Sequence, residues 1–477
     1  MQDNKSINIC PSKSDGERAL ICSYLSEIQD INDKAQALID KNEFRLKNKS
    51  GLKNVFRINN ESELKNEFRL KYEAGVKKAE ERILNLGSSE DVLALRGCLR
   101  ECLKKCIAES LGLCLDNDIK DSNFTETPII LNCKKSGANL RFLIPIVSAL
   151  GLDAVIRYEG RKRPIEPLIE TLEEKGIRFA IREGEVKTQG RLKGGNFEID
   201  GNISSQFISG LLFALPLTEN GGNIIIKGHL ESSGYVEMTI SALEKSGIYV
   251  KKNKSGYEVS GGERYAFPNQ YAVEGDWSNG SIWIAINLLL SIGRVAGRDF
   301  SVLNLLNFPI KINGLDFKSN QPDKKIMNLL EKFVKIGEDG KIYLGGDSVI
   351  DARDNPDIIP ILSGIAGLND GTTLITNASR LRLKESDRIE TICDILFKLG
   401  IDIEETSDGL IIYGVKRLRG AVVKSYDDHR IVMLAALMSL ACKGKVTIEN
   451  SEAINKSYPE FKSELKRLSL DTNIEWR

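Results

Sequence analysis

Six short segments of this 477-residue chain place small or polar residues, several with a basic side chain, directly before an apolar run. Such a run predicts a helix, and the free N–H groups and the dipole at a helix N-terminus favour an anion. A Ser or Gly at that position lets a phosphate approach the backbone. The six segments begin at Lys13, Ser136, Ser204, Asp276, Lys384 and Asp427. Together they predict a site that gathers several negative charges.

Several polar residues in or near these segments could move protons or bind anions, but each also has a simpler interpretation. An Asp after a proline could cap a helix, and an adjacent Lys-Glu pair could be a solvated surface pair. A lone His could be structural, and a Ser pair could be only a cap. The residues open to both interpretations are Asp357, Lys384, Glu385, His429, Ser204 and Ser205.

The overall composition excludes some classes of function. Lys and Arg number 67, as do Asp and Glu, so the formal net charge is zero. A general electrostatic grip on nucleic acid or on an anionic membrane is therefore not expected. No GxxxxGK[ST] loop occurs, and no GxGxxG follows a clear strand, so nucleotide binding is unsupported.

The cysteines and the first residues predict a cytoplasmic protein. The chain has 9 cysteines, an odd number, and Met1 to Asn8 contain no apolar signal region. Cys98, Cys102 and Cys106 recur every four residues and share one helical face, but their spacing is not a CxxC pattern. We expect them to be small core residues, with a metal or redox role as the alternative.

A weak internal repeat indicates an α/β fold. Helical patterns end in Gly and lead into short alternating apolar stretches such as Ile401-Asp402-Ile403. The gaps of about 60 to 90 residues are too long for a solenoid and fit a repeated βα block. The glycines are Gly112, Gly176, Gly247, Gly337 and Gly400.

Residues 28–86 break this repeat. The segment is polar, rich in Lys and Asn, and locally repetitive: residues 42–47 read NEFRLK, as do residues 66–71. We expect an insertion that is partly helical or disordered and stands off the body. A function-neutral insertion is the simpler interpretation, because surface loops accept extra length at little entropic cost, and a binding role is the alternative.

The order and spacing of several motifs resemble the 5-enolpyruvylshikimate-3-phosphate synthase family over most of the chain. Any one motif alone is weak, and their joint occurrence in order is specific. The motifs are Pro11-Ser12-Lys13-Ser14, Ser204-Ser205-Gln206, Lys384-Glu385-Ser386-Asp387-Arg388, Tyr426-Asp427-Asp428-His429-Arg430 and Lys456-Ser457-Tyr458-Pro459.

This resemblance implies a two-domain, inside-out α/β barrel. Each domain would hold three βαβαββ-type units, with the active site in the cleft between the domains. The first domain would span 13–273, including the insertion at 28–86. The second would combine 1–12 with 274–477.

The resemblance also implies the reaction. The enolpyruvyl group of phosphoenolpyruvate would pass to the 5-hydroxyl of shikimate-3-phosphate, with release of phosphate. Both substrates are polyanions, so fixed cations must offset their repulsion, and paired acid and base groups must move protons. The implied protein is a monomer that acts on small molecules, with no cofactor, metal, nucleic acid or membrane.

Carried over residue by residue, the resemblance assigns most of the site. Shikimate-3-phosphate would contact Lys13, Ser14, Arg18, Ser204, Ser205, Gln206, Ser232, Tyr235, Asp357 and Lys384. Phosphoenolpyruvate would contact Lys13, Gly137, Arg161, Gln206, Arg388, Arg430 and Lys456. The catalytic residues would be Lys13, Asp357 as the base, Glu385 as the acid on the methylene carbon, and His429.

Some positions depart from the family pattern. Lys135 stands where relatives have Asn or Glu, and Ala138 where they have Thr or Ser. Arg380 occupies a position that is Asn in some relatives. The loop that carries Arg161 is shorter than usual, so Arg161 or a neighbour such as Arg157 could reach the phosphoenolpyruvate carboxylate.

Two alternative functions remain open. The first is the enolpyruvyl transferase that acts on UDP-N-acetylglucosamine and shares the fold, although that family has Lys-Asn where this chain has Lys13-Ser14. The second is a drifted binding or scaffold protein whose useful part is the segment 28–86. Deleting that segment separates the second alternative from an enzyme with a passive insertion.

Overall fold

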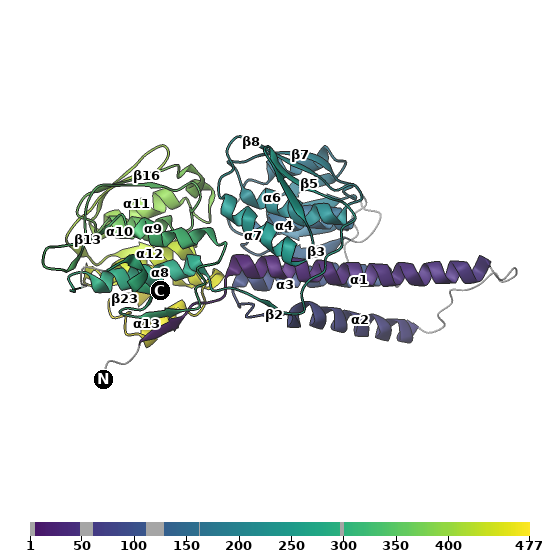
Figure 1. Cartoon of the computed structure of the whole chain (residues 1–477), viewed down its shortest axis with the longest axis horizontal. Coiled ribbons are helices and arrows are strands. Elements are labelled where there is room, and N and C mark those ends of the chain that lie inside the picture. Colours follow the sequence, from purple (N-terminus) through teal and green to yellow (C-terminus); the bar gives the residue numbers. More distant parts are fainter. Residues whose placement is uncertain (1–4, 48–60, 111–127, 162, 296–299) are drawn as a thin grey trace.

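The computed structural model describes the backbone of residues 5–47, 61–110, 128–161, 163–295 and 300–477, and the side chains outside 35–65. Within these ranges, the buried apolar residues form two cores, one in each lobe of Figure 1. The first core takes residues between Ala19 and Val273, and the second takes Ile7, Ile9 and residues between Trp277 and Leu470. We propose that the domains follow this division, at 13–273 and at 1–12 plus 274–477.

Three units repeat the same βαβαββ order, which confirms the fold class predicted from the sequence. In each, two parallel strands lie side by side and the last two strands form an antiparallel pair beside the second of them. The strand orders are β3-β4-β6-β5, β7-β8-β10-β9 and β15-β16-β18-β17.

Two of these units lie in the first lobe and one lies in the second. The first is β3 (Ile129–Asn132), α4 (Gly137–Leu150), β4 (Ala154–Arg157), α5 (Glu166–Glu173), β5 (Arg178–Arg182) and β6 (Glu185–Gln189). The second is β7 (Gly195–Asp200), α6 (Ser205–Ala214), β8 (Gly222–Lys227), α7 (Ser233–Lys245), β9 (Val250–Asn253) and β10 (Gly256–Val259). The third is β15 (Ser348–Asp351), α10 (Ile359–Ala366), β16 (Thr372–Thr376), α11 (Arg388–Leu399), β17 (Asp402–Glu405) and β18 (Leu410–Tyr413).

The rest of the second lobe contains shorter strands and the N-terminal strand. β20 (Val422–Lys424), β22 (Val446–Glu449) and β23 (Ile474–Trp476) form a parallel sheet, with α12 (His429–Ser439), the 3-10 helix η5 (Ser451–Lys456) and α13 (Phe461–Arg467) between them in the chain. β1 (Ser6–Asn8) pairs in parallel with β12 (Lys311–Asn313), which follows α8 (Trp277–Ser291). The remaining elements described in this lobe are α9 (Ile326–Leu330), β13 (Val334–Ile336), β14 (Ile342–Leu344), β19 (Leu418–Arg419), β21 (Cys442–Lys443) and the 3-10 helices η2 (Val302–Leu306), η3 (Pro322–Lys325) and η4 (Ser379–Leu383).

The segment predicted as an insertion forms most of a helical hairpin. α1 (Lys13–Lys47) and α2 (Glu61–Glu81) lie side by side under the first lobe in Figure 1, and α1 continues beyond the lobe. The prediction that 28–86 stands off the body is wrong for its two ends. Ile28, Ala79 and Ile83 are buried in the first core, and β2 (Ile83–Leu84) pairs with β11 (Tyr271–Ala272). The prediction missed these buried residues because the segment around them is mostly polar.

The predicted glycine positions hold in three places. Gly176, Gly247 and Gly400 have φ of 85°, 79° and 98° and follow the C-termini of α5, α7 and α11. The prediction at Gly337 is wrong, because this residue follows β13 and turns the chain toward β14 rather than ending a helix. Gly112 lies outside the described residues.

The cysteines on α3 (Glu90–Ser110) are core residues, as predicted. Cys98, Cys102 and Cys106 are all buried in the first core. Burial raises the pKa of the Cys106 thiol to about 12, which favours an uncharged thiol. Among the described residues, no group of three or more His, Cys, Asp and Glu side chains could hold a metal ion.

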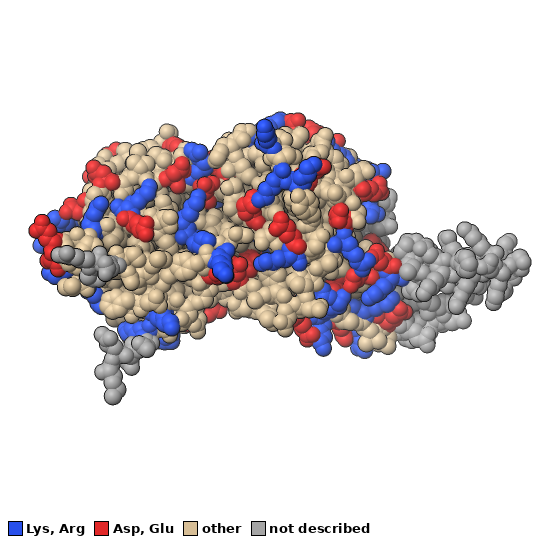
Figure 2. Space-filling view, in the orientation of Figure 1, with Lys and Arg blue, Asp and Glu red and all other residues tan. Residues whose placement is uncertain are grey.

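The surface shows mixed charge. Figure 2 shows basic and acidic side chains interspersed over both lobes, in keeping with the zero net charge. No helix within the described ranges is long and apolar enough to cross a membrane.

Candidate active site

A cleft between the lobes is lined by the N-terminal ends of helices from both lobes. These are α1, α4, α6 and α7 from the first lobe and α8, α11 and α12 from the second. Each of the six predicted segments starts one of these helices, so that prediction is confirmed. The caps have the expected form: Ser136, Ser204, Asp276, Asp387 and Asp428 each accept a hydrogen bond from a backbone N–H of their own helix.

One wall of the cleft combines hydroxyls with the guanidinium groups of Arg141 and Arg380. Ser204, Ser205 and Ser232 are all buried there, and Arg380 of the second lobe donates to the Ser232 hydroxyl across 3.0 Å. Arg141 donates to the Gln206 side-chain oxygen at 2.8 Å. Burial, and then the neighbouring guanidinium groups of Arg163 and Arg380, lower the pKa of Arg141 to about 9. Such a crowd of like charges favours a bound polyanion.

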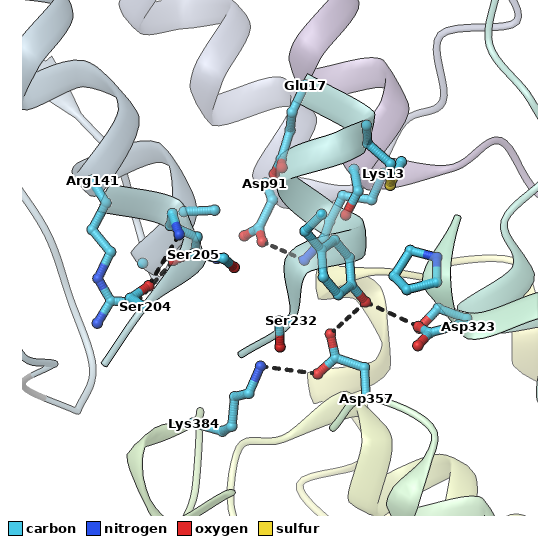
Figure 3. Close-up of a pocket in the computed structure, with 18 of the residues that line it drawn as sticks. Lys13, Glu17, Asp91, Arg141, Ser204, Ser205, Ser232, Asp323, Asp357 and Lys384 are labelled. Atoms are coloured by element: carbon cyan, nitrogen blue, oxygen red, sulfur yellow. Dashed lines mark hydrogen bonds and ion pairs between the residues drawn. The ribbon is translucent and has the colours of Figure 1, made fainter. Parts of the chain in front are cut away.

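Lys13 lies opposite this wall, between carboxylates. Its ammonium donates to Asp91 on α3 at 2.9 Å, and Figure 3 shows Glu17 above the same pair. Burial lowers the pKa of Lys13, but Asp91 and Glu17 outweigh burial and raise that pKa above its ordinary value. Lys13 is therefore a permanent cation at neutral pH.

Asp357 is held between two cations and a phenol. Lys384 donates to its Oδ1 at 3.3 Å, a contact drawn in Figure 3. Arg388 donates to the same oxygen at 2.7 Å, and the Tyr235 hydroxyl donates to its Oδ2 at 3.2 Å. Burial raises the pKa of Asp357, but Lys384 and Arg388 outweigh burial and hold that pKa well below its ordinary value. The carboxylate is therefore ionised, which is the form that a general base requires.

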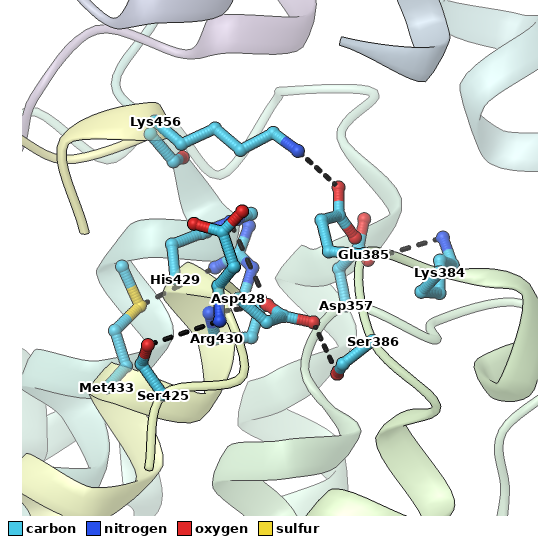
Figure 4. Close-up of polar contacts among 12 residues, drawn as sticks. Asp357, Lys384, Glu385, Ser386, Ser425, Asp428, His429, Arg430, Met433 and Lys456 are labelled. Atoms are coloured by element: carbon cyan, nitrogen blue, oxygen red, sulfur yellow. Dashed lines mark hydrogen bonds and ion pairs between the residues drawn. The ribbon is translucent and has the colours of Figure 1, made fainter. Parts of the chain in front are cut away.

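Glu385 is surrounded by cations from both lobes. Arg163 lies 2.8 Å from its Oε1, Lys456 donates to the same oxygen at 3.3 Å, and Arg388 donates to Oε2 at 2.9 Å. The Lys456 contact is visible in Figure 4. Burial raises the pKa of Glu385, but Arg163, Lys456 and Arg388 outweigh burial and keep that pKa well below its ordinary value.

Arg388 connects the two carboxylates. It is 1% exposed and also donates to Asp428 at 2.8 Å. One guanidinium therefore binds Asp357 and Glu385 at once, each through a different nitrogen.

His429 and Arg430 begin α12 at the floor of the cleft (Figure 4). Burial, and then Arg430, lower the pKa of His429 well below its ordinary value, so the imidazole is neutral at pH 7. His429 Nδ1 and Arg430 Nε are buried without a hydrogen-bond partner among the described residues.

Most of the site residues predicted from the sequence lie together. The ones that line the cleft are Lys13, Ser14, Arg18, Gly137, Ser204, Ser205, Gln206, Ser232, Tyr235, Asp357, Lys384, Glu385, Arg388, His429 and Arg430. Lys456 reaches the same place through its contact with Glu385.

Arg161 is the exception. It is exposed and does not line the cleft, and Arg157 instead pairs with Glu185 at 3.3 Å on the surface. Arg163, two residues along, lines the cleft and contacts Glu385. A Cβ on Gly137 would lie 2.7 Å from Arg163 Cδ, so the glycine at the start of α4 makes room for this arginine. We therefore propose Arg163, rather than Arg161, as the residue of this loop that binds phosphoenolpyruvate.

Several residues of the cleft were not predicted. Arg141 lies four residues after Gly137, which starts α4, and residues four apart share a helix face. The predicted helix could therefore have placed Arg141 in the site together with Gly137. Asp91 comes from α3, far from any motif, and no local pattern marked it. The residues that the sequence reasoning did not assign to the site include Glu17, Asp91, Arg141, Arg163, Asp323 and Arg380.

Comparisons with known proteins agree on one family. The model of EPSP synthase (3-phosphoshikimate 1-carboxyvinyltransferase) matches residues 73–465. A 3-phosphoshikimate 1-carboxyvinyltransferase of Clostridium perfringens is 39% identical over 412 residues, which cover 83% of this chain and 92% of that protein. Its namesake from Clostridium acetobutylicum is 37% identical over 423 residues, covering 84% and 92%.

The fold agrees as well. A solved EPSP synthase from Acinetobacter baumannii is similar with a TM-score of 0.58 and 21% identity, covering 81% of this chain and 89% of that one. The extent of the family match and the identity to the clostridial proteins settle the assignment. The chain belongs to the EPSP synthase (3-phosphoshikimate 1-carboxyvinyltransferase) family.

Proposed function

We propose that the cleft divides the family's reaction between two carboxylates joined by Arg388, with Asp357 as the base and Glu385 as the acid. The chain is a transferase of aromatic amino-acid biosynthesis that moves the enolpyruvyl group of phosphoenolpyruvate to the 5-hydroxyl of shikimate-3-phosphate and releases phosphate. The observation that carries the assignment is the double contact of Arg388 with Asp357 and Glu385.

Shikimate-3-phosphate binds along the serine wall. Its phosphate takes the hydroxyls of Ser204, Ser205 and Ser232, which are buried at the start of α6 and α7. The other proposed contacts are Lys13, Ser14, Arg18, Gln206, Tyr235, Asp357 and Lys384. The crowding of Arg141 by the guanidinium groups of Arg163 and Arg380 beside this wall supports an anion at this position.

Phosphoenolpyruvate binds among the cations around Glu385. Arg163, Arg388 and Lys456 already hold one carboxylate there, and Arg430 lies at the floor with its Nε unpartnered. Gly137 keeps the start of α4 open, and Lys13 and Gln206 face both substrates.

Substrate binding changes the state of Glu385. When the anionic groups of phosphoenolpyruvate draw Arg163, Lys456 and Arg388 to themselves, these cations hold the carboxylate less tightly. Its pKa then rises, because burial now dominates, and Glu385 can carry the proton that the methylene carbon requires.

The steps then balance. Asp357 takes the proton of the 5-hydroxyl, with Lys384 beside it, while Glu385 gives a proton to the methylene carbon of phosphoenolpyruvate. The 5-oxygen bonds to the adjacent carbon, which becomes tetrahedral. Phosphate leaves when the bond between its oxygen and that carbon breaks, and it carries away the proton that Asp357 took, while Glu385 takes a proton back from the methyl group. Neutral His429 offers a hydrogen bond near this carboxylate.

The alternatives from the sequence receive less support. The family model and the clostridial relatives carry the shikimate name rather than that of the transferase acting on UDP-N-acetylglucosamine. A drifted scaffold is not favoured, since the acid and base candidates and the surrounding cations all lie in one cleft. We further propose a cytoplasmic monomer.

Phosphate release tests the function. Purified protein is incubated with phosphoenolpyruvate, with and without shikimate-3-phosphate. Release that requires both substrates supports the proposal. No release with shikimate-3-phosphate still bound points to a defect on the phosphoenolpyruvate side, and loss of both release and binding overturns it.

A further inference from the structure

Glu17 is a buried acid beside Lys13 that the reaction described above does not use. It lies one turn after Lys13 on α1, is 2% exposed and lines the cleft. Its Oε1 is buried and has no hydrogen-bond partner within the described part of the chain. A carboxylate with an unpartnered buried oxygen is costly, whereas the neutral acid is much less so.

The cations near Glu17 are each engaged by other partners, so an ionised Glu17 would add a negative charge that is not paired. Lys13 already pairs with Asp91 at 2.9 Å, and Lys456 is drawn to Glu385. Arg18, the next residue on α1, donates to Thr239 and to the backbone oxygens of Ser14 and Tyr235 instead. An ionised Glu17 therefore places a second negative charge beside Lys13.

Burial raises the pKa of Glu17 to about 7, and Asp91 acts in the same direction while Lys13, Arg18 and Lys456 oppose them. The charged groups that face Glu17 thus come from its own helix, from α3 and from η5. Glu385 and His429 of the second lobe face Lys13 in turn. Glu17 is consequently poised to gain or lose a proton near neutral pH.

We propose that Glu17 is a positioning residue that carries a proton when phosphoenolpyruvate binds, which leaves the charge of Lys13 free for the substrates. Before phosphoenolpyruvate binds, Lys13 offsets the charge of ionised Glu17, because Lys13 then lies between the carboxylates of Glu17 and Asp91. Bringing in a polyanion adds negative charge beside Glu17 and favours proton uptake. The proposal rests on the contact of Lys13 with the substrates in the proposed function.

The test compares the pH dependence of substrate binding in matched variants. In the wild type, KM for phosphoenolpyruvate should rise between pH 6 and pH 8 by about five- to tenfold more than in Glu17→Gln, which is neutral at every pH. The substrate's own phosphate titrates in the same range, and the comparison cancels its contribution. Since Glu17 acts through Lys13 and not on the reacting atoms, kcat should change much less than KM.

Two controls define the effect. Glu17→Asp keeps a carboxyl group and should keep the wild-type pH dependence. Glu27→Gln changes another buried acid of α1, one that pairs with Arg82 and Lys78 far along the helix, and should also behave as the wild type. Equal pH slopes of KM in the wild type and Glu17→Gln would overturn the proposal.

A second measurement covers the case in which Glu17→Gln does not fold. In a background that combines Glu385→Gln with Asp357→Asn, infrared difference spectra at pH 8 should gain a protonated-carboxyl band on addition of both substrates. The background removes the proposed acid and the proposed base as sources of that band. Absence of the band with both substrates bound contradicts the proposal. Wild-type protein that releases no phosphate at any pH instead shows that the proposed function has failed.

Discussion

The guanidinium of Arg163 lies 2.8 Å from the Glu385 carboxylate, and the two residues come from opposite lobes. Arg163 follows β4 and Glu385 precedes α11. The contact joins the lobes at the place where we expect phosphoenolpyruvate, so the substrate must replace one partner of this pair. Arg163 is already largely buried and paired with Glu385, so exchanging this carboxylate for an anionic group of the substrate does not require the guanidinium to be desolvated again.

This contact predicts that substitutions of Arg163 and Arg161 differ in their effect on KM for phosphoenolpyruvate. Arg163→Ala should raise KM for phosphoenolpyruvate by about 10- to 100-fold, because a hydrogen bond to a charged group contributes about 1.5–3 kcal/mol. Arg161→Ala, which removes an exposed side chain, should change KM by less than about twofold. Steady-state kinetics decide between them. An effect at Arg161 and none at Arg163 would restore the assignment made from the sequence.

The base predicts a loss of turnover with binding preserved. Asp357→Ala should lower kcat by about 100-fold or more, since general base catalysis contributes about 10²–10⁴-fold. Shikimate-3-phosphate should still bind, because the serine wall is untouched, and calorimetric titration measures this. Wild-type turnover in this variant contradicts the role of Asp357. Asp354→Ala, which removes a surface partner of Lys325, is the matched control.

The acid predicts a pH effect in the complex. Glu385 must hold a proton when both substrates are bound, so kcat should fall as pH rises through the pKa of Glu385 in the complex. Glu385→Gln should lower kcat by about 100-fold or more and abolish this alkaline fall in its residual activity. A variant that keeps the same alkaline limb shows that another group supplies the proton.

Because Glu17 of α1 is buried, we predict that Glu17→Gln is more stable than the wild type at alkaline pH. The Glu17 pKa is about 7 in the folded protein and 4.5 ordinarily, so the folded state binds more protons between these values. The free energy of unfolding of the wild type therefore falls as pH rises from 4.5 to 7, and stays lowered above 7. Glu17→Gln should remove this loss, about 3 kcal/mol at pH 8 and almost none below pH 4.5.

Denaturant unfolding at pH 4.5 and pH 8 measures that difference, with Glu27→Gln as the comparison. Glu27 pairs with Arg82 and Lys78, so its loss should destabilise the fold at pH 8. A Glu17→Gln variant that is less stable than the wild type at pH 8 means that Glu17 is ionised and paired there.

The hairpin predicts two different outcomes for two deletions. Replacing residues 44–64 by a short Gly/Ser loop should leave turnover within about twofold, since the replacement keeps Ile28, Ala79 and Ile83 in the first core. Deleting 28–86 should prevent folding, because it removes Ile28, Ala79 and Ile83 from the first core. Thermal melting and phosphate release test both. Loss of turnover in the folded shorter deletion points to a role for the hairpin tip.

The sequence predicted those parts of the site that lie on helix starts. At Ser204, Asp387 and Asp428 the cap and the first turn fix where each side chain points, so a residue's place in its motif was enough. Irregular backbone gives no such rule. The loop after β4 has neither helical nor strand periodicity, so counting along it could not distinguish Arg161 from Arg163.

Contacts between distant segments were also out of reach. Asp91 reaches Lys13 across 78 positions, and Tyr235 reaches Asp357 across 122. Their pairing follows from packing of α3 on α1 and from the meeting of the lobes, which no local pattern encodes. The same holds for the hairpin. Its buried residues Ile28, Ala79 and Ile83 join its two ends to the first core, although the segment around them is polar.

The parallel pairing of β1 with β12 bears on how the protein is made. Ile7 pairs with Ile312, and the Asn8 and Asn313 side chains bond across 305 positions. During synthesis the N-terminal strand leaves the ribosome first, yet its partner strand does not exist until the whole first lobe has been translated. That lobe can therefore fold while the opening strand is still unpaired, and the second lobe closes around the oldest residues of the chain.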